Sequence, residues 1–144
     1  MIKDKYTVLL VDDSIDDRLF MRKALERSDR LIVSGEASDG QEAIEYLKGE
    51  GPFHDRDTYP WPDILLLDLK MPRKNGFDVL QWIQSEQVNG VLAVVISGAF
   101  LEEDVARSLA LGAAGYFKKT SIRSEQEEMI HQIEHLLERA SRAV

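Results

Sequence analysis

The 144-residue sequence contains no cysteine, so disulfide bonds and thiolate chemistry are excluded. It is also poor in positive charge: 18 Lys and Arg stand against 26 Asp and Glu, which gives a formal net charge of -8. An acidic chain is a poor match for the phosphates of nucleic acid and for an anionic membrane surface. No apolar run approaches the length of a membrane span or of a signal peptide. We therefore expect a cytoplasmic domain over residues 1–144, with no nucleic-acid or membrane partner.

Short apolar runs alternate with amphipathic segments along the chain. Most of the runs are continuous rather than alternating, which is typical of strands covered on both faces in a parallel sheet. Strands are expected at 7–11, 31–37, 64–67, 91–96 and 114–117. Helices are expected at 15–27, 38–48, 77–85, 101–111 and 121–142. Right-handed crossovers then predict an α/β fold: a flavodoxin-like, doubly wound, five-stranded parallel sheet in the order 2-1-3-4-5, with helices on both faces.

Local signals refine two of these helices. Ser14 has the character of an N-cap for the first helix, and the S-x-x-Q pattern at 38–41 is that of a capping box. Helical spacing predicts a buried face on the first helix. Its members would be Ile15, Leu19, Met21, Ala24 and Leu25.

The segment 49–62 is the one irregular region, too rich in Pro and Gly for a helix and long for a connection. It carries the aromatic residues Phe53, Tyr59 and Trp61. Two interpretations stay open: the aromatics fold back over the edge of the sheet, or they form a contact surface for another protein.

Carboxylates follow two of the expected strands at the point where each strand ends. Asp12 and Asp13 come directly after the first strand, and Asp68 follows the third. In the expected strand order these strands are neighbours, and their carboxyl ends border the ligand crevice of such folds. Two like charges 4 Å apart cost about 4 kcal/mol at an effective dielectric of 20, so a cation must offset the cluster. Oxygen ligands without His or Cys favour Mg²⁺, with Mn²⁺ as a substitute.

A hydroxyl and an amine are expected at the same edge. Ser97 follows the fourth strand, and Lys119 follows the fifth. Carboxylates, a hard metal ion, a lysine and a hydroxyl together are similar to a phosphoryl-transfer site. In such a site a carboxylate can act as the nucleophile and form an acyl phosphate.

Four motifs stand in one order on these elements. They are the Asp pair at 12–13, "DLKMP-x-x-x-G" at 68–76, "ISGA" at 96–99 and "GYFKK" at 115–119. Together they resemble the receiver domain of two-component response regulators, over essentially the whole chain. The long loop before the second motif also resembles that of stand-alone regulators paired with bacterial phytochrome-type histidine kinases. The resemblance implies a single-domain response regulator without an output domain, which catalyses its own phosphorylation and autodephosphorylation but is not a turnover enzyme.

The resemblance also implies roles at the metal site. Asp68 would be the phosphoacceptor, taking a phosphoryl group from a phosphohistidine on a sensor histidine kinase or phosphotransfer protein. Asp13 would bind Mg²⁺ directly, and Asp12 would bind it largely through water. Asp68 and the backbone carbonyl of Lys70 would complete the protein ligands.

Three further residues would sense the phosphoryl group. Ser97 and Lys119 would contact its oxygens, and Tyr116 would change rotamer as Ser97 moves. The signal would leave through protein contacts with an unidentified downstream protein. A homodimer through the long last helix is compatible with the sequence.

Two positions depart from the family pattern. Thr120 stands where the family usually has a proline after the lysine, often joined by a cis peptide, so the loop at Lys119 is either strained or rebuilt. Lys118 is then a weak substitute for Lys119. Lys70 stands where a smaller polar residue is common, and its ammonium would lie near the mouth of the site.

Other functions compete with this reading. A degenerate receiver, acting as a phosphorylation-independent interaction module, is the main alternative because of Thr120. A haloacid-dehalogenase-like phosphatase would need a second Asp at position 70, which is Lys70. The H-x-x-E-H pattern at 131–135 is similar to a zinc-peptidase motif, but a catalytic zinc needs a third ligand, so we expect an ordinary helix surface.

Overall fold

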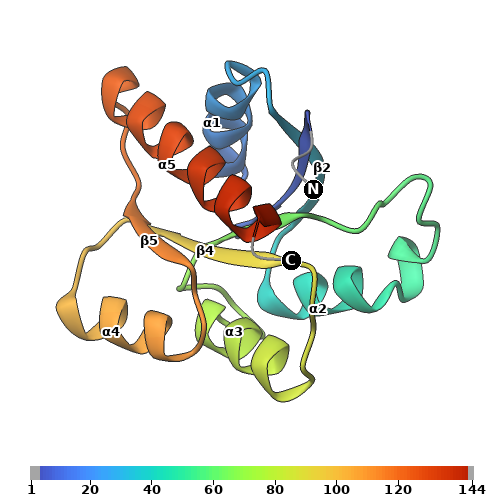
Figure 1. The fold of residues 1–144 in the computed structure, drawn as a ribbon. Helices are drawn as coiled ribbons and strands as arrows, with labels where there is room; N and C mark the ends of the chain where they lie inside the picture. The colour runs from blue at the N-terminus through green and yellow to red at the C-terminus, as the bar shows by residue number, and fades with distance from the viewer. Residues whose placement is uncertain (1–3, 143–144) are drawn as a thin grey trace.

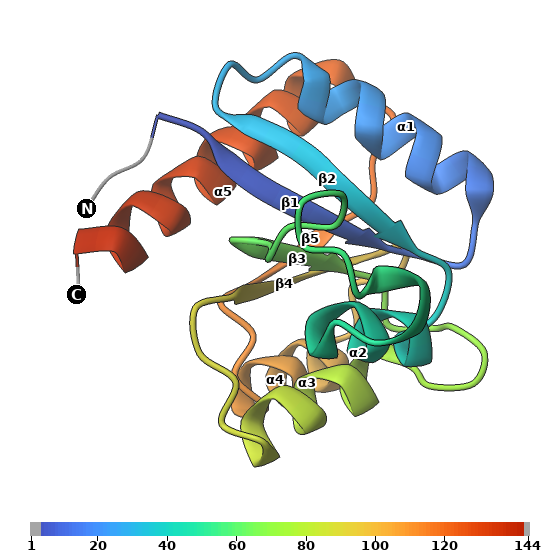
Figure 2. The same ribbon diagram turned by 90° about the vertical axis from the view of Figure 1, so that its right-hand side faces the viewer.

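A sheet of five parallel strands separates the helices into two layers in the computed structural model, which describes residues 4–142 (Figures 1 and 2). The strands are β1 (Tyr6–Val11), β2 (Leu31–Ala37), β3 (Ile64–Leu67), β4 (Leu92–Ser97) and β5 (Gly115–Lys118). The helices α1 (Ile15–Glu26) and α5 (Arg123–Arg142) lie on one face; α2 (Gly40–Lys48), α3 (Gly76–Ser85) and α4 (Glu102–Ala110) lie on the other. The strand order is β2-β1-β3-β4-β5, so the predicted fold class is confirmed.

The core has two halves, one on each face of the sheet. Strand β3 contributes to both, because Leu65 and Leu67 point into the cluster under α2 and α3, whereas Ile64 and Leu66 point into the cluster under α5. All four side chains are at most 3% exposed. The continuous apolar run therefore belongs to a strand covered on both sides, as expected. Within residues 4–142, every helix is too short or too polar to cross a lipid bilayer.

Helix α1 begins as predicted but packs differently. The Ser14 side chain accepts a hydrogen bond from the backbone N–H of Asp17 at 3.1 Å, which makes it the N-cap. The predicted buried face is wrong at two positions, since Ile15 is 73% exposed and Leu19 is 46% exposed. The two fully buried side chains of α1 are near its C-terminus, so only that half of the helix packs closely on the sheet.

The N-cap of helix α2 lies one residue later than the capping box predicted at 38–41. Asp39 is the N-cap, with extended backbone, and its Oδ1 accepts from the N–H of Glu42 at 2.8 Å. Glu42 reaches back to the N–H and hydroxyl of Ser38. The arrangement is similar to a capping box, but the cap is Asp39 instead of Ser38, and Glu42 returns to the residue before the cap.

The strands at 31–37 and 64–67 have the predicted bounds, and the remaining boundaries differ from the prediction by at most two residues. Helix α3 begins at Gly76 because Asn75 and Asp78 form a complete capping box there. Helix α5 begins at Arg123, and Ile122 before it is 55% exposed.

The segment between α2 and β3 folds back on the domain. It contains a short 3₁₀ turn, η1 (Gly51–Phe53), which the sequence did not predict. Phe53 is buried, and Tyr59 and Trp61 pack partly buried against the same half of the core. Arg56 ties the segment to α2 by donating to the carbonyl of Leu47 at 2.9 Å. The structure therefore shows the first of the two interpretations, in which the aromatic residues fold back onto the domain.

Candidate functional site

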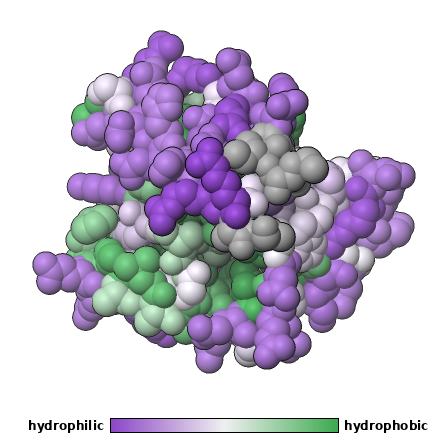
Figure 3. Space-filling view, in the orientation of Figure 1, coloured by the Kyte–Doolittle hydropathy of each residue, from purple (hydrophilic) through white to green (hydrophobic). Residues whose placement is uncertain are grey.

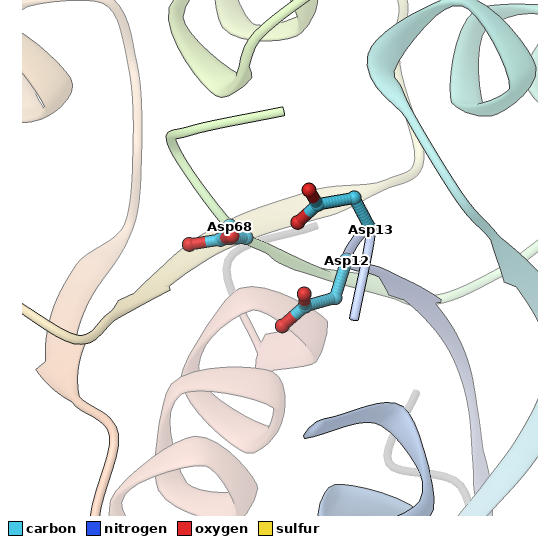
Figure 4. Close-up of side chains that lie close together, drawn as sticks. All are labelled: Asp12, Asp13 and Asp68. Atoms are coloured by element: carbon cyan, nitrogen blue, oxygen red, sulfur yellow. The ribbon is translucent and has the colours of Figure 1, made fainter. Parts of the chain in front are cut away.

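Three carboxylates converge where β1 and β3 end side by side (Figure 4). Asp12 and Asp13 follow β1, and Asp68 follows β3. Backbone bonds fix both chain segments: Asp68 N donates to Val11 O at 2.9 Å, and Asp12 N donates to Ala37 O at 3.1 Å. One oxygen from each carboxylate lies within 4.8 Å of the others. The sheet thus brings together the three acids that the sequence singled out.

Asp68 is the most enclosed of the ionisable groups at this edge. Its side chain is 10% exposed, and Oδ1 accepts from the N–H of Leu69 at 3.0 Å. Burial raises the pKa of Asp68 to about 6, and the charges of Asp12 and Asp13 act in the same direction. Lys119 and the Leu69 N–H oppose this rise. Asp68 is thus a buried carboxylate whose ionised form depends on nearby positive charge.

Lys119 supplies this positive charge, but its ammonium group is shared among three carboxylates. Its Nζ lies 2.8 Å from Asp12 Oδ2 and 3.6 Å from Asp68 Oδ2. A third carboxylate, Asp17 of α1, also lies 2.8 Å from Nζ. Burial would lower the pKa of Lys119, but the hydrogen bonds to Asp12 and Asp17 and the attraction of Asp68 hold it above its ordinary value. Lys119 therefore stays charged.

Asp17 is a residue of the site that the sequence analysis missed. An acidic residue in the first turn of a helix is a common feature and does not by itself indicate a site. No local pattern could indicate its contact with Lys119, which lies 102 residues further along the chain.

Ser97 and Tyr116 meet at a single residue of the loop after β4. Ser97 is 5% exposed, and its Oγ accepts from the N–H of Ala99 at 3.3 Å. Tyr116 donates its hydroxyl hydrogen to the carbonyl of Ala99 at 2.9 Å, and its ring meets that of Phe100 edge-on at 5.4 Å. The two proposed switch residues are thus connected through Ala99.

The loop after Lys119 is rebuilt around Thr120. Residues 4–142 contain no cis peptide bond, so the Lys119–Thr120 bond is trans. The Thr120 hydroxyl donates to Glu125 at 2.6 Å and accepts from the N–H of Ile122 at 3.1 Å. Gln126 donates to the Thr120 carbonyl at 2.8 Å. Lys119 therefore reaches the carboxylates without a proline, whereas Lys118 is exposed on β5.

The loop between β3 and α3 closes tightly against Asp68. Gly76 N donates to the carbonyl of Leu69 at 2.9 Å. A Cβ on Gly76 would lie 2.5 Å from the carbonyl oxygen of Asp68, so the first turn of α3 requires glycine here. Lys70, which was expected to offer its carbonyl to a metal, lies in this loop with an exposed side chain.

The donor set fits a hard divalent cation. All three carboxylates offer oxygen, and Asp12 and Asp68 are buried while Asp13 is exposed. This is the chemistry that Mg²⁺ and Mn²⁺ prefer, with room for water on the exposed side. Across the described residues, this is the only group of three or more acidic, His or Cys side chains with metal-binding geometry. His131 and His135 are exposed on α5, and residues 4–142 bring no third ligand into metal-binding geometry with them.

Comparison with known proteins identifies the class. A model of the response regulator receiver domain matches residues 8–134, so the chain belongs to this family. The nitrate/nitrite response regulator protein NarL of Escherichia coli (strain K12) is 32% identical over 126 residues, which make up 88% of this chain and 53% of NarL. The chain thus spans about half the length of that relative.

Two cyanobacterial proteins are similar over most of their length. Response regulator Rcp1 of Synechocystis sp. is 30% identical over 131 residues, covering 88% of this chain and 85% of Rcp1. The Mn²⁺-bound form of Rcp1 superposes with a TM-score of 0.72 at 29% identity, over 90% of this chain and 91% of that one. The phosphorylated cyanobacterial phytochrome response regulator RcpA gives a TM-score of 0.76 at 29% identity, over 92% and 94%. The resemblance to phytochrome response regulators is therefore confirmed.

Proposed function

We propose that this receiver domain accepts a phosphoryl group on Asp68 in a Mg²⁺-dependent reaction. The observation that carries the proposal is the placement of Asp68, a buried carboxylate between the acid pair at 12–13 and Lys119. At neutral pH a carboxyl group with a pKa of about 6 is largely ionised, so an oxygen lone pair is available for attack. The family relationship and the Mn²⁺-bound structure of Rcp1 support the same assignment.

The reaction is a group transfer from a phosphohistidine of the kinase or phosphotransfer protein. An oxygen of Asp68 attacks phosphorus and forms the acyl phosphate bond. The phosphorus–nitrogen bond breaks, and its electron pair returns to the imidazole nitrogen of the donor. A bound Mg²⁺, held by Asp12, Asp13, Asp68 and the carbonyl of Lys70, would neutralise the charge on the phosphoryl oxygens.

The protein side chains then hold the product. Lys119 supplies a point charge to the phosphoryl oxygens, and the hydroxyl of Ser97 supplies a hydrogen bond. To do so Ser97 turns away from Ala99, the residue whose carbonyl holds Tyr116. The phosphoryl group would thus shift the loop after β4 and Tyr116 between two populated arrangements.

The signal would leave through a protein contact near β5 and α4. Figure 3 shows apolar side chains gathered below α5, over the region where Figure 1 places β5 and α4. Phe100, Leu101 and Leu109 are each between 45% and 56% exposed at this corner. The similarity to RcpA favours a phytochrome-type sensor histidine kinase as the donor. The same corner and the exposed side of α5 would serve a downstream protein or a homodimer.

Intact mass spectrometry after incubation with acetyl phosphate and Mg²⁺ tests this proposal. The wild type should gain a single phosphoryl group, and Asp68→Asn should gain none. Chelation of Mg²⁺ should abolish the adduct. If no adduct forms, beryllofluoride binding separates a very short lifetime from a degenerate receiver, because beryllofluoride mimics the aspartyl phosphate without hydrolysing. Absence of both would favour the interaction module.

A further inference from the structure

One ion pair at the site has no part in the reaction described above. Lys119 Nζ lies 2.8 Å from Asp17 Oδ2. The same Nζ is 3.6 Å from Asp68 Oδ2, which it would need to serve after phosphoryl transfer. Asp17 is held in place by α1, since its backbone N–H is bonded to the Ser14 cap. The lysine is therefore bound more closely to the first helix than to the phosphoacceptor.

Asp17 is separate from the carboxylates that could share a metal ion. The metal-binding group consists of Asp12, Asp13 and Asp68. Asp17 and Lys119 line a cavity of about 610 Å³ beside α1, together with Asp12 and Asp68 of the metal-binding group. Their side chains are 41% and 25% exposed, so solvent reaches the contact and it can break without unfolding the core.

We propose that Asp17 is a positioning residue that holds Lys119 toward α1 and competes with Asp68 for its ammonium group. This inference rests on the proposed function. Transfer of a phosphoryl group adds negative charge at Asp68 and draws Lys119 toward it. The contact with Asp17 must then be weakened or broken, and this cost is subtracted from the stability of the phosphorylated state. Asp17 thereby shortens the lifetime of that state.

Beryllofluoride affinity in the presence of Mg²⁺ measures the effect without turnover. Asp17→Asn should bind beryllofluoride about threefold to fivefold more tightly than the wild type, as expected for loss of a partly exposed ion pair. Asp16→Asn is the matched control, because Asp16 lies in the same helical turn, carries the same charge and is exposed. It should bind as the wild type does. Equal gains in both variants would reveal a general charge effect and overturn the proposal.

A second background tests whether Asp17 acts through Lys119. In a Lys119→Ala protein, Asp17→Asn should leave the weakened beryllofluoride affinity unchanged. A gain that persists there would overturn the proposal, since the lysine would not be the intermediary. The dephosphorylation rate of the acetyl-phosphate adduct should also fall in Asp17→Asn. A wild type that neither forms the acetyl-phosphate adduct nor binds beryllofluoride overturns both proposals, whereas unchanged affinity in Asp17→Asn overturns only this one.

Discussion

Arg73 Nε lies 2.7 Å from Asp39 Oδ2, and this ion pair joins the loop after β3 to the first turn of α2. Asp39 is 6% exposed and also caps α2 through Glu42. A backbone bond runs alongside, since Gly40 N donates to Lys74 O at 2.8 Å. The loop that follows Asp68 is therefore anchored to the start of α2.

We expect Arg73→Gln to weaken Mg²⁺ binding. The anchored loop carries the Lys70 carbonyl, which we propose as a metal ligand, and release of the loop would leave this carbonyl less well placed. The loss should be about twofold to fivefold, because the Arg73 side chain is 56% exposed although Asp39 is buried. Titration calorimetry with Mg²⁺ checks it, and Lys74→Gln, which removes a neighbouring exposed charge, serves as the control. Equal Mg²⁺ affinities for wild type and Arg73→Gln would contradict this role.

The same ion pair predicts a pH dependence of stability. Burial alone would raise the pKa of Asp39, but the hydrogen bonds from Arg73 and from backbone N–H groups lower it overall. A carboxylate with a lowered pKa stabilises the fold above its unfolded value, near 3.8, and loses that contribution as pH falls. Asp39→Asn keeps the N-cap but not the charge, so its Tm should lie below that of the wild type at neutral pH. The two Tm values should converge below about pH 4. A Tm difference that is the same at every pH would mean that the charge of Asp39 does not contribute to stability.

Asp68 should show the opposite sign in the absence of metal. Its folded pKa of about 6 lies above the unfolded value of 3.8, so ionisation costs stability as pH rises through that window. Asp68→Asn in EDTA should therefore be more stable than the wild type by about 1–3 kcal/mol at pH 7, at about 1.4 kcal/mol per pH unit. The gain should disappear near pH 4. The same comparison is then made with added Mg²⁺. The Tm of the wild type should now rise more than that of Asp68→Asn, because the variant lacks one proposed metal ligand.

The fold followed from the sequence because its strands carry strong, simple signals. The run Ile64–Leu67 is apolar at every position, and each of its side chains enters one half of the core. Asp12, Asp13 and Asp68 were identifiable because strand ends in a parallel sheet converge at one edge. Both inferences depend on local composition and on general rules of topology.

The sequence-based predictions were wrong or incomplete where tertiary contacts determine whether a residue is buried or belongs to the site. Ile15 has the spacing of a core residue, but the N-terminal half of α1 does not pack closely on the sheet. Asp17 became a site residue only through its contact with Lys119, which lies 102 residues further along the chain. The loop at Thr120 was uncertain because its geometry depends on Glu125 and Gln126 of α5.

Tyr116→Phe should loosen the loop after β4. The variant loses the hydrogen bond to the Ala99 carbonyl, which should cost about 0.5–1.5 kcal/mol of stability. Amide hydrogen exchange should become faster at Ala99 and Phe100 without a change in β3. Phe100→Leu is the control, because it removes the ring contact but keeps the hydroxyl bond. Unchanged exchange in Tyr116→Phe would show that the hydroxyl does not hold the loop.

Gly76→Ala should damage both the fold and the site. Its Cβ would lie 2.5 Å from the carbonyl oxygen of Asp68 and 2.9 Å from the Cα of Leu69, so the backbone that presents the Asp68 carboxylate must shift. Overpacking of this kind costs about 1–3 kcal/mol, and phosphorylation by acetyl phosphate should slow as well. Gly98→Ala is the matched control, because a Cβ at Gly98 meets no atom within 4 Å. Chemical denaturation and adduct formation should separate the two variants; if Gly76→Ala behaves like Gly98→Ala, the close approach of α3 does not position Asp68.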